Sequence, residues 1–387
     1  MFRSGGPKRW QVDATGLFGD PIVVAGRMVV PCADRRVYVL DAATGQVVWG
    51  YRRSEGTPSL EFPPRSIAYH RGLIYLTEPE SGGHLLALDG EAEVRWEQPL
   101  DHGPGRDVVA ASTAGGDGIV VAGTAAHLYC FDAGTGEPRW RFAHGDPAPA
   151  PWGRPLVLTD IVVGSAYRLS GQVGSGHTSI VVALGRTDGR ERWRVRTEEH
   201  GTRVAGDDDL VLVATAEGRL AAHDARTGTL RWQRQFSEGV YPEVAVEMER
   251  LRGGRQRMFY TPAAAELTTP VLAGDRIWVG CGDGHVYLLE RASGEVVTRW
   301  AATMPPTSLT LVDGVIYVGG HAGVLAALVA DDAGHELWWR QIPTGSVAGI
   351  TVDADTLYVS AGKHLATFDA ATGNGPPEWR RRTAHRP

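Results

Sequence analysis

Short apolar runs alternate with turn residues along the whole chain. The runs are rich in β-branched and aliphatic residues, as in PIVVAGRMVV, VIYVGG and LYVSAG. Gly or Asp interrupts each run before apolar residues could recur at the 3.6-residue period of a helix. Short runs bounded by Gly and Asp are typical of β-strands joined by tight turns. The sequence therefore predicts an all-β protein.

One segment of this pattern recurs along the chain. Its clearest copies are VYVLDAATGQVVW, LYCFDAGTGEPRW and LAAHDARTGTLRW, in which an apolar run is followed by Asp, then Gly and finally Trp. Weaker copies complete eight units at an average spacing of about 47 residues. The residues that mark the turn of each unit are Asp41, Asp89, Asp132, Gly185, Asp224, Glu290, Val329 and Asp369. The tryptophans that end the units are Trp49, Trp96, Trp140, Trp193, Trp232, Trp300, Trp338 and Trp379.

A second hairpin precedes each copy, as in SLTLVDGVIYV and GITVDADTLYVS. Two hairpins give four strands in each unit of about 47 residues, which is typical of a propeller blade. We therefore expect residues 1–387 to form one domain, an eight-bladed β-propeller of four-stranded antiparallel blades. Seven blades is the alternative.

The Asp and Trp of each unit have structural interpretations. The Asp side chain can accept hydrogen bonds from backbone N–H groups two and three residues further on, and the Gly supplies the positive φ that the turn needs. We expect the Trp to seal neighbouring units against each other, without a chemical role. Trp10 resembles the end of a further outer strand, so either Trp10 or Trp379 could complete the last blade.

The Asp-Ala-x-Thr-Gly-x-x-x-Trp pattern resembles the PQQ-type (quinoprotein-like) β-propeller repeat, and the resemblance covers nearly the whole chain. It implies the fold but no single function, because the same repeat serves quinoprotein dehydrogenases and a periplasmic scaffold of outer-membrane assembly. Resemblance to the dehydrogenases would imply two adjacent cysteines that stack on the quinone, with a calcium site nearby. Cys32, Cys130 and Cys281 are far apart, so we expect neither PQQ nor another cofactor.

Composition narrows the classes of function. Lys and Arg number 39 against 45 Asp and Glu, for a formal net charge of −6 without a basic stripe. Nucleic acid is therefore not an expected partner. No apolar run is long enough to cross a membrane, and no apolar segment follows the first basic residues as in a secretion signal. These features, with three widely separated cysteines, predict a cytoplasmic location.

Long connections are expected on only one face of the propeller. The turns within the hairpins of each unit are short, whereas the long segments all reach the opposite face, at 51–65, 142–154, 165–179 and 236–268. Loops on one face of a rigid framework commonly carry binding sites. The 236–268 insertion could form a lid, a packed surface loop or an oligomer contact. Within it, we expect a short helix at residues 243–251.

Candidate binding residues lie at the channel mouth, where the innermost strand of each blade begins. Aligning the units places Asp20, Arg65, Arg154 and Arg203 at this position. The arginines could dock a carboxylate or phosphate through bidentate hydrogen bonds, or they could simply be solvated charges of a hydrated channel. Loop residues that could stack on a ligand or exchange protons with it are Trp152, His200, Tyr241, Glu243, Phe259 and Tyr260.

No metal site is expected. The histidines that share one position in four different units are His84, His127, His285 and His364. In a ring these side chains would lie too far apart to bind one metal ion. The turn of three aspartates at 207–209 lacks further ligands, and no His-Glu-x-x-His, paired Cys-x-x-Cys or acidic calcium loop is present in the sequence.

Two functions from different classes follow. The first is a propeller that binds a small organic ligand or a protein partner on its loop-rich face, without PQQ. The second is a cofactor-independent enzyme of a specialised-metabolite pathway, of the cyclase, isomerase or lyase type, that holds a small organic substrate at the channel mouth. The sequence contains no nucleophile elbow or phosphate loop that would assign catalytic residues. It leaves open the oligomeric state and the choice between the two functions.

Overall fold

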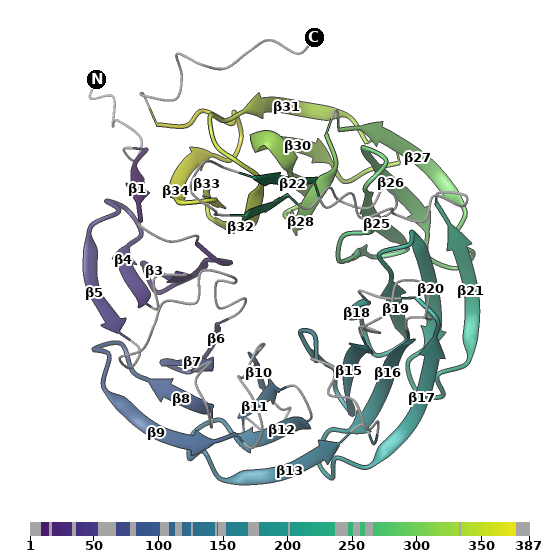
Figure 1. The fold of residues 1–387 in the computed structure, drawn as a ribbon. Coiled ribbons are helices and arrows are strands. Elements are labelled where there is room, and N and C mark those ends of the chain that lie inside the picture. Colours follow the sequence, from purple (N-terminus) through teal and green to yellow (C-terminus); the bar gives the residue numbers. More distant parts are fainter. Residues whose placement is uncertain are drawn as a thin grey trace.

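The structure is a computed structural model, which describes residues 9–14, 18–32, 36–52, 67–77, 83–100, 108–112, 118–124, 127–143, 145, 152–168, 178–199, 202–236, 247–250, 256–259, 266–302, 304–332 and 334–376. Within these residues the secondary structure is almost entirely β, with one turn of 3-10 helix, η1 (His321–Gly323). Eight four-stranded antiparallel sheets are arranged in a ring (Figure 1). The predicted eight-bladed propeller is confirmed, and the alternative of seven blades is wrong.

Each blade contains four strands, which we call A to D from the innermost to the outermost (Figure 1). Blade 1 contains β2 (Ile22–Val24), β3 (Arg27–Cys32), β4 (Arg36–Asp41) and β5 (Val47–Arg52), and blade 2 contains β6 (Ala68–His70), β7 (Leu73–Thr77), β8 (His84–Leu88) and β9 (Val94–Pro99). Blade 3 contains β10 (Val108–Ser112), β11 (Gly118–Gly123), β12 (His127–Asp132) and β13 (Pro138–Ala143), and blade 4 contains β14 (Leu156–Val157), β15 (Ile161–Arg168), β16 (Thr178–Gly185) and β17 (Glu191–Thr197). Blade 5 contains β18 (Arg203–Gly206), β19 (Leu210–Ala214), β20 (Arg219–Asp224) and β21 (Leu230–Gln235), and blade 6 contains β24 (Val271–Ala273), β25 (Arg276–Cys281), β26 (His285–Glu290) and β27 (Val296–Ala301). Blade 7 contains β28 (Pro306–Val312), β29 (Val315–Gly320), β30 (Val324–Val329) and β31 (Glu336–Gln341), and blade 8 contains β32 (Val347–Asp353), β33 (Thr356–Ala361), β34 (His364–Asp369) and β1 (Gln11–Asp13).

The apolar runs of the sequence form the two middle strands of each blade. In blade 3, strand B is buried along its whole length, because neighbouring blades cover both faces of the sheet. Strand D of the same blade alternates between exposed and half-buried residues, since only one of its faces meets a neighbour. Several A–B turns are two-residue hairpin turns, as at Ala25 and Gly26 in blade 1, whose φ values are 47° and 73°. Two successive positive φ values match the right-handed twist of the paired strands.

Neighbouring blades are joined by the Trp of strand D. In blade 4, the Trp193 indole N–H donates to the Ala225 carbonyl of blade 5 at 2.9 Å. The indole packs on Gly228 in the same turn, which has a φ of 72° and where a Cβ atom would lie 2.7 Å from the ring. Asp224 shapes this turn by accepting the backbone N–H groups two and three residues further on. Trp193 thus seals blade 4 against blade 5.

The same indole-to-carbonyl hydrogen bond recurs around the ring. The other pairs in the described residues are Trp10 with Ala42, Trp49 with Gly90, Trp96 with Ala133, Trp140 with Arg186, Trp232 with Arg291 and Trp338 with Ala370. The turn aspartates that accept backbone N–H groups in their own turns in the same way are Asp41, Asp89, Asp132 and Asp369. Trp300 differs, because its indole N–H donates to the carboxylate of Glu336 at 3.1 Å.

The N-terminal segment closes the ring. β1 pairs antiparallel with β34 and supplies strand D of blade 8, so the two ends of the fold meet in one sheet (Figure 1). Trp10 occupies the position that the strand D tryptophan has in the other blades. Its indole N–H donates to the Ala42 carbonyl of blade 1 at 3.1 Å. The partly buried side chain of Arg9 donates to the Asp369 carboxylate at 2.8 Å. Of the two tryptophans considered for this role, Trp10 occupies it, and Trp379 lies outside the described residues.

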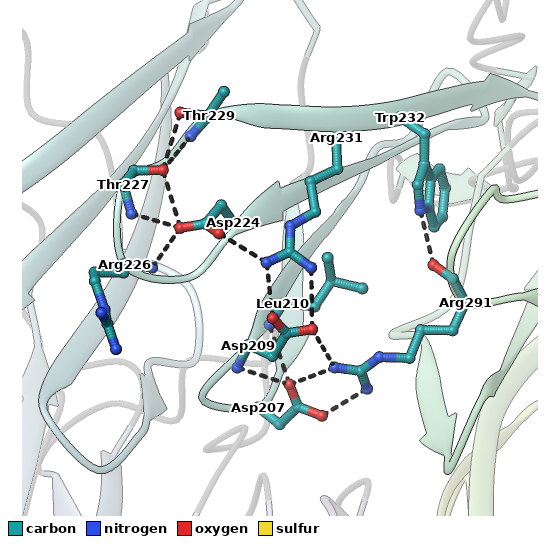
Figure 2. Close-up of polar contacts among 10 residues, drawn as sticks. All are labelled: Asp207, Asp209, Leu210, Asp224, Arg226, Thr227, Thr229, Arg231, Trp232 and Arg291. Atoms are coloured by element: carbon teal, nitrogen blue, oxygen red, sulfur yellow. Dashed lines mark hydrogen bonds and ion pairs between the residues drawn. The ribbon is translucent and has the colours of Figure 1, made fainter.

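The A–B turn of blade 5 carries three consecutive aspartates, and arginines neutralise two of them (Figure 2). Arg291, in the C–D turn of blade 6, donates to both carboxylate oxygens of Asp207 at 2.6 and 2.8 Å. Arg231, on strand D of blade 5, donates to Asp209 and to Asp224, both at 2.7 Å. The middle aspartate accepts two hydrogen bonds from a threonine in the A–B turn of blade 4. These contacts connect blades 4, 5 and 6 on the turn face.

We predict that Gly228→Ala lowers the free energy of unfolding by about 2–4 kcal/mol, because Ala would need a positive φ and would also collide with Trp193. Gly274→Ala is the matched control. Its φ is 61° and no atom lies within 4 Å of its Cβ position, so only the backbone cost of about 1 kcal/mol applies. Chemical denaturation measures both variants. Equal losses would show that the indole contact adds nothing.

We predict that the Asp207–Arg291 pair makes part of the stability depend on pH. The hydrogen bond from Arg291 lowers the pKa of Asp207 from 3.8 to about 2. Because the folded-state pKa lies below the unfolded value, this contribution is complete above about pH 4 and is lost as the pH falls toward 2. The thermal midpoint of the wild type should therefore fall more steeply between about pH 4 and pH 2 than that of Asp207→Asn. Asp355→Asn, in an exposed turn, should follow the wild type; parallel curves for Asp207→Asn and the wild type would argue against the prediction.

Candidate functional site

A pocket of about 250 Å³ opens on the face where the innermost strands begin, between blades 5, 6 and 7. Arg203 is the first residue of β18 in blade 5, Thr307 lies near the start of β28 in blade 7, and His321 lies in the B–C loop of blade 7. Residues 266–268, at the end of the 236–268 insertion, complete this part of the wall. The pocket therefore lies on the face predicted to carry the long connections.

Hydrogen bonds connect the residues before strand A to the end of strand B in blade 6 and to the B–C loop in blade 7, and they shape this pocket. In blade 6, the Thr268 N–H donates to the Gly280 carbonyl, and the Thr268 hydroxyl accepts the Gly280 N–H, both at 2.9 Å. In blade 7, the His321 N–H donates to the Pro305 carbonyl at 3.0 Å. A Cβ atom on Gly280 would lie 2.7 Å from Pro306. Glycine at this position therefore lets blades 6 and 7 approach each other closely beside the pocket.

Arg203 lies at the pocket, but a carboxylate of the chain already balances its charge. Its guanidinium forms an ion pair with Glu266 and donates to the Leu267 carbonyl at 2.6 Å. These contacts connect strand A of blade 5 to the end of the insertion that precedes blade 6. An anionic ligand would have to displace Glu266 to form the bidentate contact that we expected of this arginine.

His321 contributes a second polar side chain. Its Nδ1 atom lies 2.7 Å from the hydroxyl of Ser346, in the connection from blade 7 to blade 8. Burial lowers the pKa of His321, and the nearby Glu266 carboxylate opposes this shift. The imidazole is thus neutral at pH 7. His321 and Ser346 were not among the candidates from the sequence. Most of those candidates came from the start of strand A in each unit, whereas His321 lies in a B–C loop and Ser346 in a D–A connection, which also reach this face.

The other described candidates lie in other blades. Asp20 is in blade 1, where a Cβ atom on Gly349 of blade 8 would lie 2.6 Å from its carboxylate. Arg154 is exposed before strand A of blade 4. The structure thus does not bring Asp20 or Arg154 to the pocket that Arg203 lines. The candidates outside the described residues are Arg65, His200, Tyr241, Glu243 and Tyr260, and of Phe259 only the backbone, at the end of β23, is described.

Trp152 is a core residue, in contrast to the expectation that it stacks on a ligand from a loop. It is 1% exposed, and its backbone forms a bridge with Ala166. Its ring packs edge-on against Phe142, with 6.2 Å between the ring centroids. A Cβ atom on Gly164 would lie 2.8 Å from the indole, so this glycine makes room for it. Phe18 forms the equivalent bridge in blade 1, which identifies the position as an apolar anchor at the start of a blade.

The described part of the 236–268 insertion is a β-hairpin. β22 (Glu247–Arg250) pairs antiparallel with β23 (Gln256–Phe259). The helix expected at residues 243–251 is therefore wrong for the residues that the structure describes. In the segment EVAVEMERL, Val244, Val246 and Met248 occupy every second position, and this two-residue period of larger apolar residues matches a strand.

The aligned histidines lie in different blades. The nearest carboxylates are Glu97 for His84 at 3.6 Å, Asp283 for His285 at 3.3 Å and Asp13 for His364 at 2.7 Å. Across the described ranges, no group of three or more His, Cys, Asp or Glu side chains could hold a metal ion. The same ranges contain no helix long and apolar enough to cross a membrane.

The residues present do not fit PQQ. The three cysteines lie on β3, β12 and β25, in three different blades, so no adjacent pair could stack on a quinone. All three are fully buried, and burial raises the pKa of Cys130 and Cys281 to about 12. Arg203, which could otherwise bind a carboxylate of the cofactor, is paired with Glu266. No step of any reaction is therefore assigned to this cofactor.

Fold and repeat together define this protein as an eight-bladed propeller of the PQQ-type repeat. The family model described as outer membrane protein assembly factor BamB matches residues 3–175, 177–252 and 282–387, and the chain belongs to this family. It is 23% identical to quinohemoprotein alcohol dehydrogenase ADH-IIG of Pseudomonas putida over 310 residues, which cover 73% of this chain and 39% of that enzyme. It is 22% identical to outer membrane protein assembly factor BamB of Shewanella oneidensis over 344 residues, which cover 80% of this chain and 83% of that protein.

Among solved structures, the chain is similar to the computationally designed Ika8 protein, with a TM-score of 0.67 and 15% identity. The match covers 92% of this chain and 96% of that protein. At this identity the likeness shows the fold alone. The matched part of the chain spans only 39% of the length of the P. putida dehydrogenase, so the activity of that enzyme does not carry over with the fold.

We predict that Arg203→Ala lowers the free energy of unfolding by about 1–2 kcal/mol, because it leaves Glu266 and the Leu267 carbonyl without their cation. Arg154→Ala, at an exposed position in the neighbouring blade, should change it by less than about 0.5 kcal/mol. Urea denaturation of the two variants makes the comparison. If both substitutions had the same effect, Arg203 would not be a link between blades.

Proposed function

We propose that this protein is a binding propeller that holds a protein partner on the face carrying the long connections. The observation that carries the proposal is the position of the pocket. It lies between three blades on that face, and its wall includes the end of the longest insertion. Sites built from connections on a rigid framework can change without altering the framework.

The size and lining of the pocket favour a protein over a small organic ligand. Its volume of about 250 Å³ is below the roughly 300–1,000 Å³ that commonly encloses such a ligand. Its wall places Leu267 and Pro306 beside the charged Glu266 and Arg203. A mixed pocket of this size is typical of a place where one side chain of a partner anchors a larger interface. The family description, which names an assembly factor, supports the same class of function.

Site-specific photo-crosslinking in the host of this protein tests the proposal. A benzoylphenylalanine residue in place of Thr307, in the pocket wall, should form an adduct of one defined mass. Ser293, in the exposed C–D turn of blade 6 on the opposite face, is the matched control position and should form none. Equal crosslinking at both positions, or none at Thr307, would count against a partner on this face.

Native mass spectrometry of the protein purified gently from its host distinguishes the kind of ligand. We expect a co-purifying polypeptide that is lost when Thr307→Trp fills the pocket, since an anchoring side chain then has no space. Gly274→Ala, in an A–B turn with open space around it, is the control and should retain the polypeptide. A small bound mass in place of a polypeptide would contradict the proposal and favour a small organic ligand.

A further inference from the structure

His321, which lines the pocket, forms a hydrogen bond with Ser346, an exposed residue beside the pocket in the connection from blade 7 to blade 8. The Nδ1 atom of His321 lies 2.7 Å from the Ser346 Oγ atom. The backbone N–H of His321 is held by the Pro305 carbonyl at 3.0 Å. Ser346 directly precedes β32, whose first residue, Val347, accepts the Thr307 hydroxyl at 2.6 Å. Hydrogen bonds therefore hold both connections in place. One is at His321 itself, and the other is at Val347, the residue after Ser346.

The surroundings of His321 suit a general base. Burial lowers its pKa, so the ring is neutral at pH 7 and can accept a proton from the Ser346 hydroxyl. Glu266 lies close enough for its negative charge to favour the protonated ring, and Arg203 holds that carboxylate in place. A serine hydroxyl hydrogen-bonded to a neutral imidazole is an arrangement that activates the serine for nucleophilic attack. Glu266 acts on the imidazole through its charge.

Backbone donors lie beside Ser346. In the part of the chain that the structure describes, the N–H groups of Gly345 and Ser346 have no acceptor. Gly345 and Ser346 are both exposed, so a ligand can reach these donors from solvent. N–H groups adjacent to a nucleophile can stabilise the negative charge that develops on a carbonyl oxygen during attack.

We propose that the exposed Ser346 is a nucleophile and His321 its general base, with Glu266 as a positioning residue, for acyl transfer from small esters whose acyl group enters the pocket beside Ser346. The volume of about 250 Å³ limits the acyl group to a few carbon atoms. This activity goes beyond the binding function proposed above. It uses the same pocket but needs no protein partner.

The reaction balances with water as the only co-reactant. As the Ser346 Oγ atom bonds to the ester carbonyl carbon, its proton passes to Nδ1 of His321. The tetrahedral intermediate then expels the alcohol oxygen, which takes the proton from His321 and leaves an acyl group on Ser346. Water, deprotonated by His321, attacks this acyl group and releases the carboxylic acid, and the proton returns to the serine oxygen.

A fluorophosphonate probe tests the pair, because attack by an activated serine forms an O–P bond and expels fluoride. Intact-mass spectrometry and peptide mapping of the full chain should find one adduct, at Ser346. Ser346→Ala should abolish it, and His321→Gln should slow labelling by about 100-fold or more. Glu266→Gln should slow it less, and Glu266→Asp should restore part of the rate. Ser293→Ala should change nothing, because Ser293 is a turn serine bonded to Glu290 at 2.6 Å.

Three results would overturn this proposal: no adduct on a protein that melts cooperatively, an adduct on Ser293 at the same rate, or labelling of Ser346 that persists in His321→Gln. Hydrolysis of p-nitrophenyl acetate, followed in the wild type and in Ser346→Ala, gives an independent measurement, and equal rates would also overturn it. The two functions fail separately. Labelling without crosslinking at Thr307 would contradict only the protein-binding function, and crosslinking without labelling would contradict only the acyl transfer.

Discussion

The propeller depends on a joint in which the Trp of one blade donates its indole N–H to a turn of the next. Trp193, for example, reaches the Ala225 carbonyl while its ring covers Gly228. A single blade has apolar side chains on both faces of its sheet, so it can bury them only between two neighbours. The hydrophobic clusters accordingly combine adjacent blades, as where Leu212 of blade 5 packs with Ile277 of blade 6. The joint determines how closely these faces approach.

The same joint explains why the two faces of the propeller differ. A C–D turn must keep its backbone shape and an accessible carbonyl to receive the Trp. The contacts of residues 207–209 also bind an A–B turn to its neighbours. Insertions there would break contacts between blades. The B–C loops and D–A connections take no part in the joint. The pocket lies among them, with the Arg203–Glu266 and His321–Ser346 pairs, so a site can vary there while the ring stays intact.

Much of the fold could be predicted because its determinants are local, whereas the site could be predicted only in part. An Asp and a Gly a few residues apart specify a turn wherever they occur. Trp152 was misjudged because its neighbours in sequence, Pro151 and Gly153, are typical of a loop, although packing against Phe142 buries it. The helix expected at residues 243–251 failed for a related reason, since the two-residue apolar alternation outweighed the helix-forming residues.

The sequence by itself determined the number of blades, the chemistry of their turns and the face with the long connections, because hydrophobic alternation and turn residues act within one unit. Only the tertiary structure decided that Trp10 closes the ring, that Arg203 pairs with Glu266 and that His321 meets Ser346. The last two partners are 63 and 25 residues apart in the chain. Whether such side chains meet depends on how adjacent blades lie against each other in the closed ring, and no single unit encodes that geometry.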